Sequence, residues 1–556
     1  MKTKFTRRGL FGLGLAPAAY AGLGAGAAAA PRAAAPTAAI FDIRDFGAQG
    51  DGHSLNTRAL QAAVDACHRA QGGVVLVPAG KYVIGTVELK SWVTLRLEAG
   101  ATLLGSGDGR DYHAASEIPL HGDATLVDGR VGLLYAVNAE NITIEGPGTI
   151  DGQGERFRSP RRGAPPPSGR GGHRRPYHLL FYRCRQLRVR NLTLLRSAYH
   201  SIRVVQSRRC WFEDLHIHSR VLSNNDGFHF ISCEYVHIDG CDIQSGDDAC
   251  ALFGSCRNVT VANSSFSTRW SVFRFGGGAA ENIAVTNCIL HEVYGCPIKM
   301  QCNPGSRFEN ISFSNLAMEN VTGPIQIGNG PRARRRRGQP PQAPARPEVA
   351  SPGVVRNISF SHIRARVVHP QLRPSLMPYP THYQPGEIYA CIALNGMGNS
   401  WLEDISFDDV QIVFPGGGTA AMAARAVPEF SGEYFQNGIL PAWALYARNV
   451  RGLSLANVRL TLAAADARPG LHFEAVADAA LNGLSLAGDA GAAALRFDAV
   501  ADCLIDSPRL LSPAAAFLEA AGACRNLRIE GGDLSRAAQT VRFRQGAPAG
   551  AVQVRE

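Results

Sequence analysis

Three aspartates and two cations lie at similar intervals in the middle of the chain. The segment SNNDGF contains Asp226, and SGDDAC contains Asp247 and Asp248, 21 and 22 residues later. Arg274 and Lys299 follow in STRWSVFRFGGG and GCPIKM. Carboxylates that lie close together raise one another's pKa, so one can stay protonated while its neighbour is ionised. Such a pair can protonate a leaving oxygen and activate a water molecule, which is the chemistry of hydrolysis.

The elements that would position these residues are short strands with a period near 24 residues. Each repeat alternates apolar and polar residues over four to eight positions, and this alternation is typical of strands. From Leu187 the spacings are 24, 25, 23, 24 and 28 residues, and later 47, 47 and 48. The repeats are NITIEG at 141, QLRVRNLTL at 186, CWFEDLHIHS at 210, YVHIDGCDI at 235, NVTVANSSF at 258, NIAVTNCIL at 282, NISFSNLAM at 310, NISFSHIRA at 357, DISFDDVQI at 404 and GLSLANVRL at 452.

Strands at a fixed period with polar corners predict an all-β fold, a parallel β-helix in which each coil adds about 4.8 Å along the axis. Stacking would make residues one period apart neighbours in space. The late spacings are close to double the period, and we expect the intervening turns to hold single strands in GPIQIGNG and IYACIALNGM. A helical pattern in TRALQAAVDACHRA predicts a short helix that caps the first coil. One β-helix domain is expected over residues 36–556.

Residues 1–35 are typical of an export signal. A basic start with Arg7 and Arg8 precedes an apolar, Ala/Gly-rich stretch and small residues near Ala28–Ala30. The order Thr-Arg-Arg-x-x-Phe is similar to a twin-arginine signal, and the alternative is an ordinary secretory signal that contains two arginines. Both predict export to the periplasm or beyond. No later apolar run approaches the roughly 20 residues that span a bilayer, so we expect no membrane partner.

The net charge of +11 is concentrated in two Pro/Gly-rich segments, which are predicted to be loop insertions near residues 159–176 and 331–352. Such loops are usually solvated, and the alternative is a basic rim that attracts an anionic polymer. No nucleic-acid-binding module accompanies the charge, so nucleic acid is not an expected partner. The 13 cysteines form no CxxC pair and lie mostly in strand-like segments, which predicts buried apolar side chains rather than a zinc site or a disulfide framework.

Longer motifs make the chain similar to glycoside hydrolase family 28, the polygalacturonases and their relatives. FDIRDFGAQGDGHSLNTRALQAAVDAC, GGVVLVPAGKY, ATLLGS and GPGTIDGQG resemble the first coils of pectin-degrading right-handed β-helix proteins. The family's Asn-Thr-Asp-Gly corresponds to Asn224-Asn225-Asp226-Gly227, its Asp-Asp step to Gly246-Asp247-Asp248, and its Arg-Ile-Lys to Pro297-Ile298-Lys299. The resemblance covers about residues 40–460.

The resemblance implies a glycosidase that acts on a plant-type polysaccharide, pectic in kind, with inversion at the anomeric carbon and without a metal or other cofactor. Asp247 would be the general acid. Asp226 and Asp248 would hold and deprotonate the attacking water. Lys299 would bind a carboxylate or hydroxyl of the substrate.

Two departures from the family pattern leave the sugar open. The family's Gly-His-Gly is replaced by Arg269-Trp270-Ser271-Val272, and the arginine of Arg-Ile-Lys is replaced by Pro297. Arg274 is a candidate to supply the lost cation, because a guanidinium binds a carboxylate in a bidentate manner. Its alternative role is that of a solvated strand residue. Trp270 could stack on a sugar ring or cover the core.

Three further positions are weaker candidates around Asp226. Asn225 precedes it in the motif and is a candidate substrate-binding residue. His229 lies close enough in sequence to tune the site, because its ordinary pKa is near 6.5; the alternative is a structural histidine. His200 and Tyr199 are candidates of the same kind.

Other functions remain compatible with these residues. A polysaccharide lyase would use the three aspartates to hold Ca²⁺, with Arg274 or Lys299 as the base. A uronate epimerase shares this logic but does not cleave the chain, and a carbohydrate-binding β-helix would have no activity at all. Among hydrolase substrates, galacturonan, rhamnogalacturonan and neutral polymers stay open, as does endo or exo attack. A monomer is expected.

Overall fold

The structure, a computed structural model, describes residues 39–118, 131–157, 175–331, 351–370, 383–544 and 546–555. From Ala39 onward the chain forms one unit. The predicted export signal at 1–35 lies outside the described residues, as do most of the predicted insertions at 159–176 and 331–352. Within the described ranges no helix is long and apolar enough to cross a membrane.

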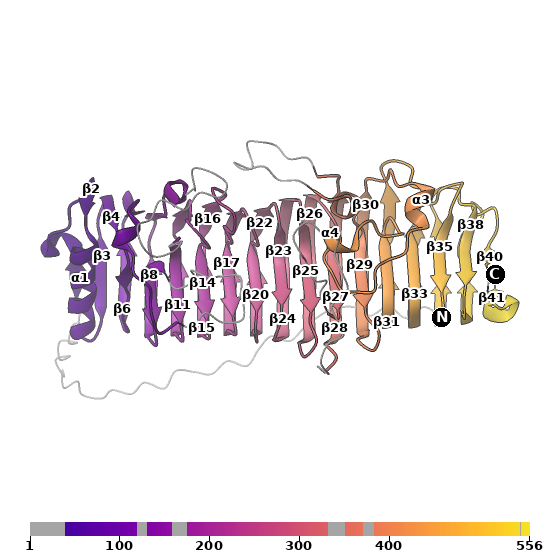
Figure 1. Cartoon of the computed structure of the whole chain (residues 1–556), viewed down its shortest axis with the longest axis horizontal. Coiled ribbons are helices and arrows are strands. Elements are labelled where there is room, and N and C mark those ends of the chain that lie inside the picture. The colour runs from indigo at the N-terminus through magenta and orange to yellow at the C-terminus, as the bar shows by residue number, and fades with distance from the viewer. Residues whose placement is uncertain are drawn as a thin grey trace, which may run out of the picture. The chain divides into compact units, whose positions relative to one another are not determined.

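Parallel strands stack in three columns, and a full coil passes through each column in turn. We call them columns A, B and C in the order in which a coil visits them. Figure 1 shows the successive coils from the N-terminal to the C-terminal end of the described chain. The strands of column A are β5 (Val87–Glu88), β8 (Gly132–Val137), β11 (Tyr177–Tyr182), β14 (Ile202–Val205), β17 (Phe228–Ile231), β20 (Cys250–Phe253), β23 (Ser271–Gly276), β25 (Cys296–Cys302), β27 (Ile325–Asn329), β29 (Ile392–Gly396), the first parts of β31 (Leu445–Ala456) and β33 (Leu471–Asn482), β35 (Ala493–Asp498), β38 (Ala516–Ala521) and β40 (Val541–Phe543).

Columns B and C follow within each coil, and four long strands, β24, β26, β28 and β30, run through both. Column B holds β1 (Ile40–Asp42), β3 (Gly73–Val77), β6 (Val93–Leu97), β9 (Glu140–Glu145), β12 (Arg185–Arg190), β15 (Arg208–Glu213), β18 (Glu234–Asp239), β21 (Arg257–Ala262), β24 (Ala279–Val293), β26 (Arg307–Val321), β28 (Val354–Val367), β30 (Leu402–Phe414), the second parts of β31 and β33, β36 (Ala501–Asp506), β39 (Arg525–Glu530) and β41 (Val552–Arg555). Besides the long strands, column C holds β2 (Asp51–Leu55), β4 (Gly80–Ile84), β7 (Ala101–Gly105), β10 (Thr149–Asp151), β13 (Thr193–Leu195), β16 (His216–Ser219), β19 (Asp242–Ser245), β22 (Ser265–Thr268), β32 (Arg459–Leu462), β34 (Ser485–Leu486) and β37 (Arg509–Leu510).

The register of column B follows the repeat read from the sequence. Leu187 pairs with Cys210, Cys210 with Val236, and Val236 with Val259, and all four side chains are buried. Inward side chains of successive coils stack on one another, as Phe313 does on Phe360, with ring centroids 5.3 Å apart. The prediction of an all-β parallel β-helix with about one coil per 24 residues is therefore confirmed.

The doubled spacings in the second half have a different origin from the one expected. Ile311 pairs directly with Ile358, and Ile358 with Ile405, so each 47-residue interval is one coil and not two. The expected single strands do form, as β27 and β29, but they are the column A strands of these same coils. The extra length lies in connections between columns, such as residues 415–444 between β30 and β31, which contain helices α3 (Ala420–Ala423) and α4 (Tyr434–Asn437).

Asparagine side chains stack at the start of column B. Asn258, Asn282, Asn310 and Asn357 all have φ between 55° and 57°, a left-handed conformation that asparagine tolerates better than most residues. The amides of Asn282, Asn310 and Asn357 each donate to the asparagine of the preceding coil, at 3.3, 3.1 and 2.8 Å respectively. This ladder satisfies side-chain hydrogen bonds and fixes the corner.

The first coil is covered by helix α1 (Thr57–Arg69), as its sequence pattern predicts. Its buried residues, Leu60, Ala63, Val64 and Cys67, lie on one face, which packs against β1, β3 and β5. The remaining short helices are α2 (Pro385–Ile388) and the 3-10 turns η1 (Ile43–Phe46), η2 (Gly109–Asp111), η3 (Gly154–Phe157) and η4 (Ala549–Ala551).

All 13 cysteines are buried and unpaired, in agreement with their interpretation as apolar core residues. Burial raises the pKa of Cys184, for example, to about 11. Such thiols stay protonated and behave as small hydrophobic side chains.

Candidate active site

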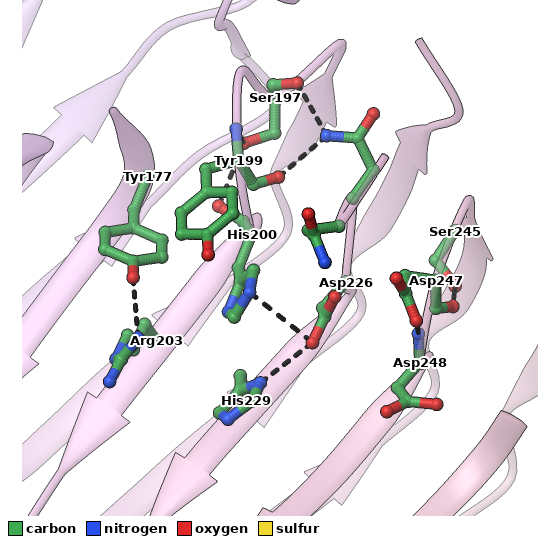
Figure 2. A network of polar contacts seen from close by, with 12 residues as sticks. Tyr177, Ser197, Tyr199, His200, Arg203, Asp226, His229, Ser245, Asp247 and Asp248 are labelled. Atoms are coloured by element: carbon green, nitrogen blue, oxygen red, sulfur yellow. Dashed lines mark hydrogen bonds and ion pairs between the residues drawn. The ribbon is translucent and has the colours of Figure 1, made fainter. Parts of the chain in front are cut away.

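The three aspartates lie in the turns that lead from column C into column A. Phe228 pairs with Cys250, so Asp226 and Asp248, each two residues earlier, take equivalent positions on adjacent coils. Their turns are joined by backbone hydrogen bonds, among them Gly227 N to Asp248 O at 3.0 Å. Figure 2 shows Asp226, Asp247 and Asp248 on the same side of these strands. The structure thus brings the three carboxylates together, as the repeat predicts.

Asp226 is held by two stacked histidines. His229 Nδ1 lies 2.8 Å from Asp226 Oδ2, and His200 Nε2 lies 3.6 Å from the same oxygen (Figure 2). The two imidazole rings stack with centroids 4.5 Å apart, and Phe253 stacks on the far side of His229 at 5.1 Å. This packing fixes the orientation of the Asp226 carboxylate. His229 therefore contacts a catalytic candidate directly, and His200 belongs to the same cluster.

Burial holds the pKa of His200 well below its usual value, and the neighbouring charges of His229 and Arg203 act in the same direction. His200 is therefore neutral at physiological pH. Tyr199 lies against its ring at 4.5 Å, and Tyr177 accepts a hydrogen bond from Arg203 at 2.6 Å (Figure 2). These aromatic residues form the wall behind Asp226.

The side chain of Asn225, a substrate-binding candidate from the motif, makes its hydrogen bonds within the protein. Its side-chain oxygen accepts from the backbone N–H groups of Val221 and Leu222, and its amide donates to the carbonyl oxygens of Ser197 and Tyr199. The residue is 0% exposed. Both ends of the amide are committed to the protein, so Asn225 shapes the turn that presents Asp226.

Asp247 is the partly exposed member of the carboxylate group. Burial of its carboxyl raises its pKa well above the usual value, and the nearby charges of Asp226 and Asp248 raise it further. Asp247 Oδ1 accepts a hydrogen bond from the backbone N–H of Asp248 at 3.0 Å. A carboxyl with this environment retains its proton at a pH where an ordinary aspartate is ionised.

Asp248 is buried, and burial raises its pKa as well, but the charges of Arg274 and Lys299 oppose that rise. The two cations favour the ionised form of Asp248. Its Oδ1 has no hydrogen-bond partner among the described residues. When Asp247 and Asp248 share one proton, the proton therefore resides mainly on Asp247, and Asp248 is the ionised carboxylate.

Arg274 and Lys299 are adjacent in the register of column A, and both are buried. The sequence predicts this proximity, but not their partner. Glu433 bridges them, with Lys299 Nζ at 3.0 Å from Oε2 and Arg274 Nη2 at 3.3 Å from Oε1. Glu433 lies in the long connection between β30 and β31, outside any repeat. No signal in the sequence points to it, because a residue in an irregular connection has no register.

Trp270 neither covers the core nor lies fully in solvent. The Lys299 ammonium lies 4.2 Å from the centroid of its indole ring, and Phe435 lies at 6.1 Å. The ring is half-buried, and it holds Lys299 by a cation–π interaction. Arg269, which precedes it, is also half-buried and donates to the Gly246 carbonyl at 2.9 Å.

One group of described side chains has the donor types of a transition-metal site. The ligand atoms of His200, Asp226 and His229 lie within 4.8 Å of one another. Imidazole nitrogens with one carboxylate suit zinc and similar ions rather than Ca²⁺, which takes six to eight oxygen ligands. Asp247 and Asp248 do not belong to this group of described residues.

Comparison with known proteins agrees with this geometry. The model of glycosyl hydrolases family 28 matches residues 67–343. This match places residues 67–343 of the chain in glycoside hydrolase family 28. The matched region contains all three aspartates, Arg274 and Lys299, whereas Glu433 lies beyond it.

Individual relatives match this chain over only part of its length. A Vitis vinifera protein named "Probable polygalacturonase" is 36% identical over 221 residues, 37% of this chain and 43% of the relative. An exo-poly-alpha-D-galacturonosidase of Dickeya chrysanthemi is 42% identical over 120 residues, 21% of this chain and 20% of the relative. The chain thus spans less than half of these two relatives. The family 28 exopolygalacturonase of Yersinia enterocolitica has the same fold, with a TM-score of 0.56 at 19% identity over 80% of this chain and 78% of that one.

Proposed function

We propose that this protein is a glycoside hydrolase that cleaves a pectic polysaccharide with inversion, using Asp226, Asp247 and Asp248. One observation carries the proposal: three carboxylates meet on adjacent coils, and burial together with the neighbouring carboxylates raises the pKa of the partly exposed one, Asp247, well above its usual value. Inverting glycosidases need one protonated carboxyl for the leaving oxygen and one carboxylate for the water. Membership of family 28 supports the same reaction class.

The roles follow from the environment of each carboxyl. Asp247 protonates the glycosidic oxygen, because its pKa is raised well above the usual value and part of its surface is exposed. Asp248, opposite Arg274 and Lys299, and Asp226, held by His229, orient the water and accept its proton. Lys299 contacts the sugar on the side of Asp248. The reaction uses no metal or other cofactor.

The reaction is tested on a panel of pectic and other plant-wall polysaccharides with a reducing-end assay and product mass spectrometry. We expect new reducing ends without an unsaturated product that absorbs in the near ultraviolet, and Asp247→Asn removes them. An unsaturated product instead indicates a lyase, changed sugar configuration without cleavage indicates an epimerase, and binding without any product indicates a carbohydrate-binding β-helix. Each of these outcomes contradicts the proposal.

The protein is exported by the twin-arginine route and acts as a monomer outside the cytoplasm. The motif around Arg7 and Arg8 supports the route, and the 13 unpaired buried cysteines suit a chain that folds before export. Replacing both arginines with lysine should retain the protein in the cytoplasmic fraction. Light scattering of the purified protein tests the monomer, and a dimer mass contradicts it.

A further inference from the structure

The buried cations of the site already have an anionic partner within the chain. Lys299 is 3% exposed, Arg274 is 5% exposed, and Glu433, which bridges them, is 5% exposed. An ammonium and a guanidinium placed to recognise a substrate carboxylate would have to exchange Glu433 for it. Such an exchange leaves the glutamate buried without its partners, which is strongly unfavourable.

Hydrogen bonds of Glu433 and of its neighbours in sequence fix Glu433 in this position. On one side of it, the hydroxyl of Ser431 accepts a hydrogen bond from Gln301 at 2.7 Å. On the other side, the Tyr434 hydroxyl donates to the Ile325 carbonyl at 3.0 Å. The backbone N–H of Glu433 itself donates to Gln436 at 3.0 Å, within the capping box of α4. The segment around Glu433 is therefore hydrogen-bonded to the column A strands β25 and β27, next to the site.

Further carboxylates face the same ammonium. Asp248 and Glu387 both interact electrostatically with Lys299. Glu387 is buried in α2, and burial raises its pKa, which Glu433 raises further. Three carboxyl groups thus surround Lys299. The neighbouring cations are Arg274 and Arg269, of which Arg269 lowers the pKa of Glu387. A uronate carboxylate placed here adds a fourth acidic group to a site that is already rich in them.

Two atoms beside the Glu433 bridge suit hydroxyl groups. Arg274 Nη1 is a buried donor without a hydrogen-bond partner among the described residues. Asp248 Oδ1 is a buried acceptor of the same kind, and the nearby Ser271 hydroxyl lowers the pKa of Asp248. Buried polar atoms in native proteins are nearly always paired, so an unpaired donor and acceptor in a site are positions that a water molecule or a hydroxyl group of a ligand can fill. A sugar hydroxyl donates and accepts at once, whereas a carboxylate only accepts.

We propose that the sugar unit held against Lys299 is uncharged, and that Glu433 is the residue that determines this specificity. The inference rests on the proposed function and narrows it: the substrate is a pectic polymer that places a neutral sugar at this subsite, rather than an uninterrupted chain of uronates. Glu433 then accepts hydroxyl hydrogen bonds and repels a carboxylate.

The wild-type protein tests this directly with two matched substrates. They are oligomers of α-linked galacturonate and the same oligomers with every carboxyl reduced to a primary alcohol. We expect kcat/KM to be at least about tenfold higher on the reduced oligomers, the size of effect that one unfavourable buried charge produces. Equal or higher kcat/KM on the charged oligomers overturns the inference. If neither these oligomers nor any polysaccharide of the panel is cleaved, it is the proposed function that fails.

The variant Glu433→Gln tests the residue. It keeps the shape of the side chain but removes its charge, so Lys299 and Arg274 become available to a carboxylate. We expect the ratio of kcat/KM for charged over reduced oligomers to rise about tenfold or more. Glu309→Gln is the matched control, because Glu309 is likewise buried and paired with two arginines, Arg307 and Arg356, but lies in column B. A ratio that moves equally in both variants, or in neither, contradicts the role of Glu433; if Glu433→Gln does not fold, the wild-type comparison decides.

Discussion

The asparagine ladder of column B and the turns of the candidate site are built on the same coils but meet opposite demands. In the ladder, Asn258, Asn282, Asn310 and Asn357 place identical neutral side chains above one another, and each amide bonds to the next. In the turns from column C to column A, stacking places charged groups above one another, and the pKa of Asp247 is raised as a result.

The difference lies in what stacking does to a repeated side chain. An amide has both donor and acceptor, so repetition at one coil spacing satisfies it. A carboxylate only accepts, so repetition creates repulsion that has to be offset by protonation or by cations. The ladder thus serves stability, and the turns hold a strained electrostatic arrangement that suits catalysis. Each prediction below separates these two regions, and they run from the largest expected effect to the smallest.

Asp247→Asn should reduce kcat by about 10²- to 10⁴-fold, because it removes the general acid while keeping the shape of the side chain. Asp242→Asn, on the same coil, is the control: Asp242 is half-exposed and lies 3.0 Å from His216, outside the site. Steady-state kinetics on the substrate identified by the panel measure both. If kcat falls by a similar factor in the two variants, Asp247 is not the general acid.

His229→Phe should lower kcat by about 10²-fold, because Asp226 loses the partner that orients it and small displacements of a catalytic group are costly. Phenylalanine keeps the stacking on Phe253 but removes the Nδ1 contact. His229→Asn restores an N–H donor near the same place and should recover most of the rate. If the two variants are equally impaired, His229 serves packing and not orientation.

Asn310→Ala should lower the free energy of unfolding by about 1–2 kcal/mol, because alanine tolerates the left-handed conformation less well than asparagine and cannot make the ladder hydrogen bonds, and it should leave kcat unchanged. Asn310 has φ 57° and bonds to the asparagines above and below it. Asn310→Gly removes the same hydrogen bonds without the backbone strain, so it should cost less. Urea unfolding measures the free energy of unfolding of the wild type and both variants. If both variants lose the same amount, the loss comes from the ladder hydrogen bonds and not from backbone strain.

Asp247→Asn should raise the free energy of unfolding at neutral pH, because it removes a carboxyl whose ionised form is disfavoured in the folded protein. The pKa of Asp247 is higher in the folded protein than in the unfolded chain, so the folded state binds its proton more tightly. That contribution is present below the ordinary aspartate range and is lost as the pH rises through the folded value. The stability gain of the variant should therefore appear at neutral pH and vanish near pH 3.

Much of the fold and of the carboxylate group can be predicted from the sequence, because coil register turns sequence intervals into spatial neighbours. Asp226, Asp247 and Asp248 follow from this register, and Lys299 follows one coil after Arg274. Coil register cannot predict spatial neighbours for residues in the long connections outside the repeats. Glu433 comes from a long connection with no period, and its partners are more than a hundred residues away.

Two features of the molecule become clear only from the structure: the hydrogen bonds of Asn225 and the meaning of the 47-residue spacing. Asn225 is adjacent to Asp226 in sequence, but its amide is used by four backbone groups, which only the conformation of the turn reveals. The spacing of 47 residues equals two periods, yet Ile311 pairs directly with Ile358. An insertion and an extra coil have the same length in sequence, and only the pairing distinguishes them.

The assignment of Asp247 as the acid is tested most directly with a substrate that does not need one. On an aryl glycoside of the released sugar with an activated leaving group, bond cleavage requires no proton donor. We predict that Asp247→Asn then works within about tenfold of the wild type, whereas Asp226→Asn and Asp248→Asn remain impaired. If Asp247→Asn is as impaired on the aryl glycoside as on the polysaccharide, or if Asp248→Asn is the variant that recovers, the proposed division of roles among the three carboxyls is wrong.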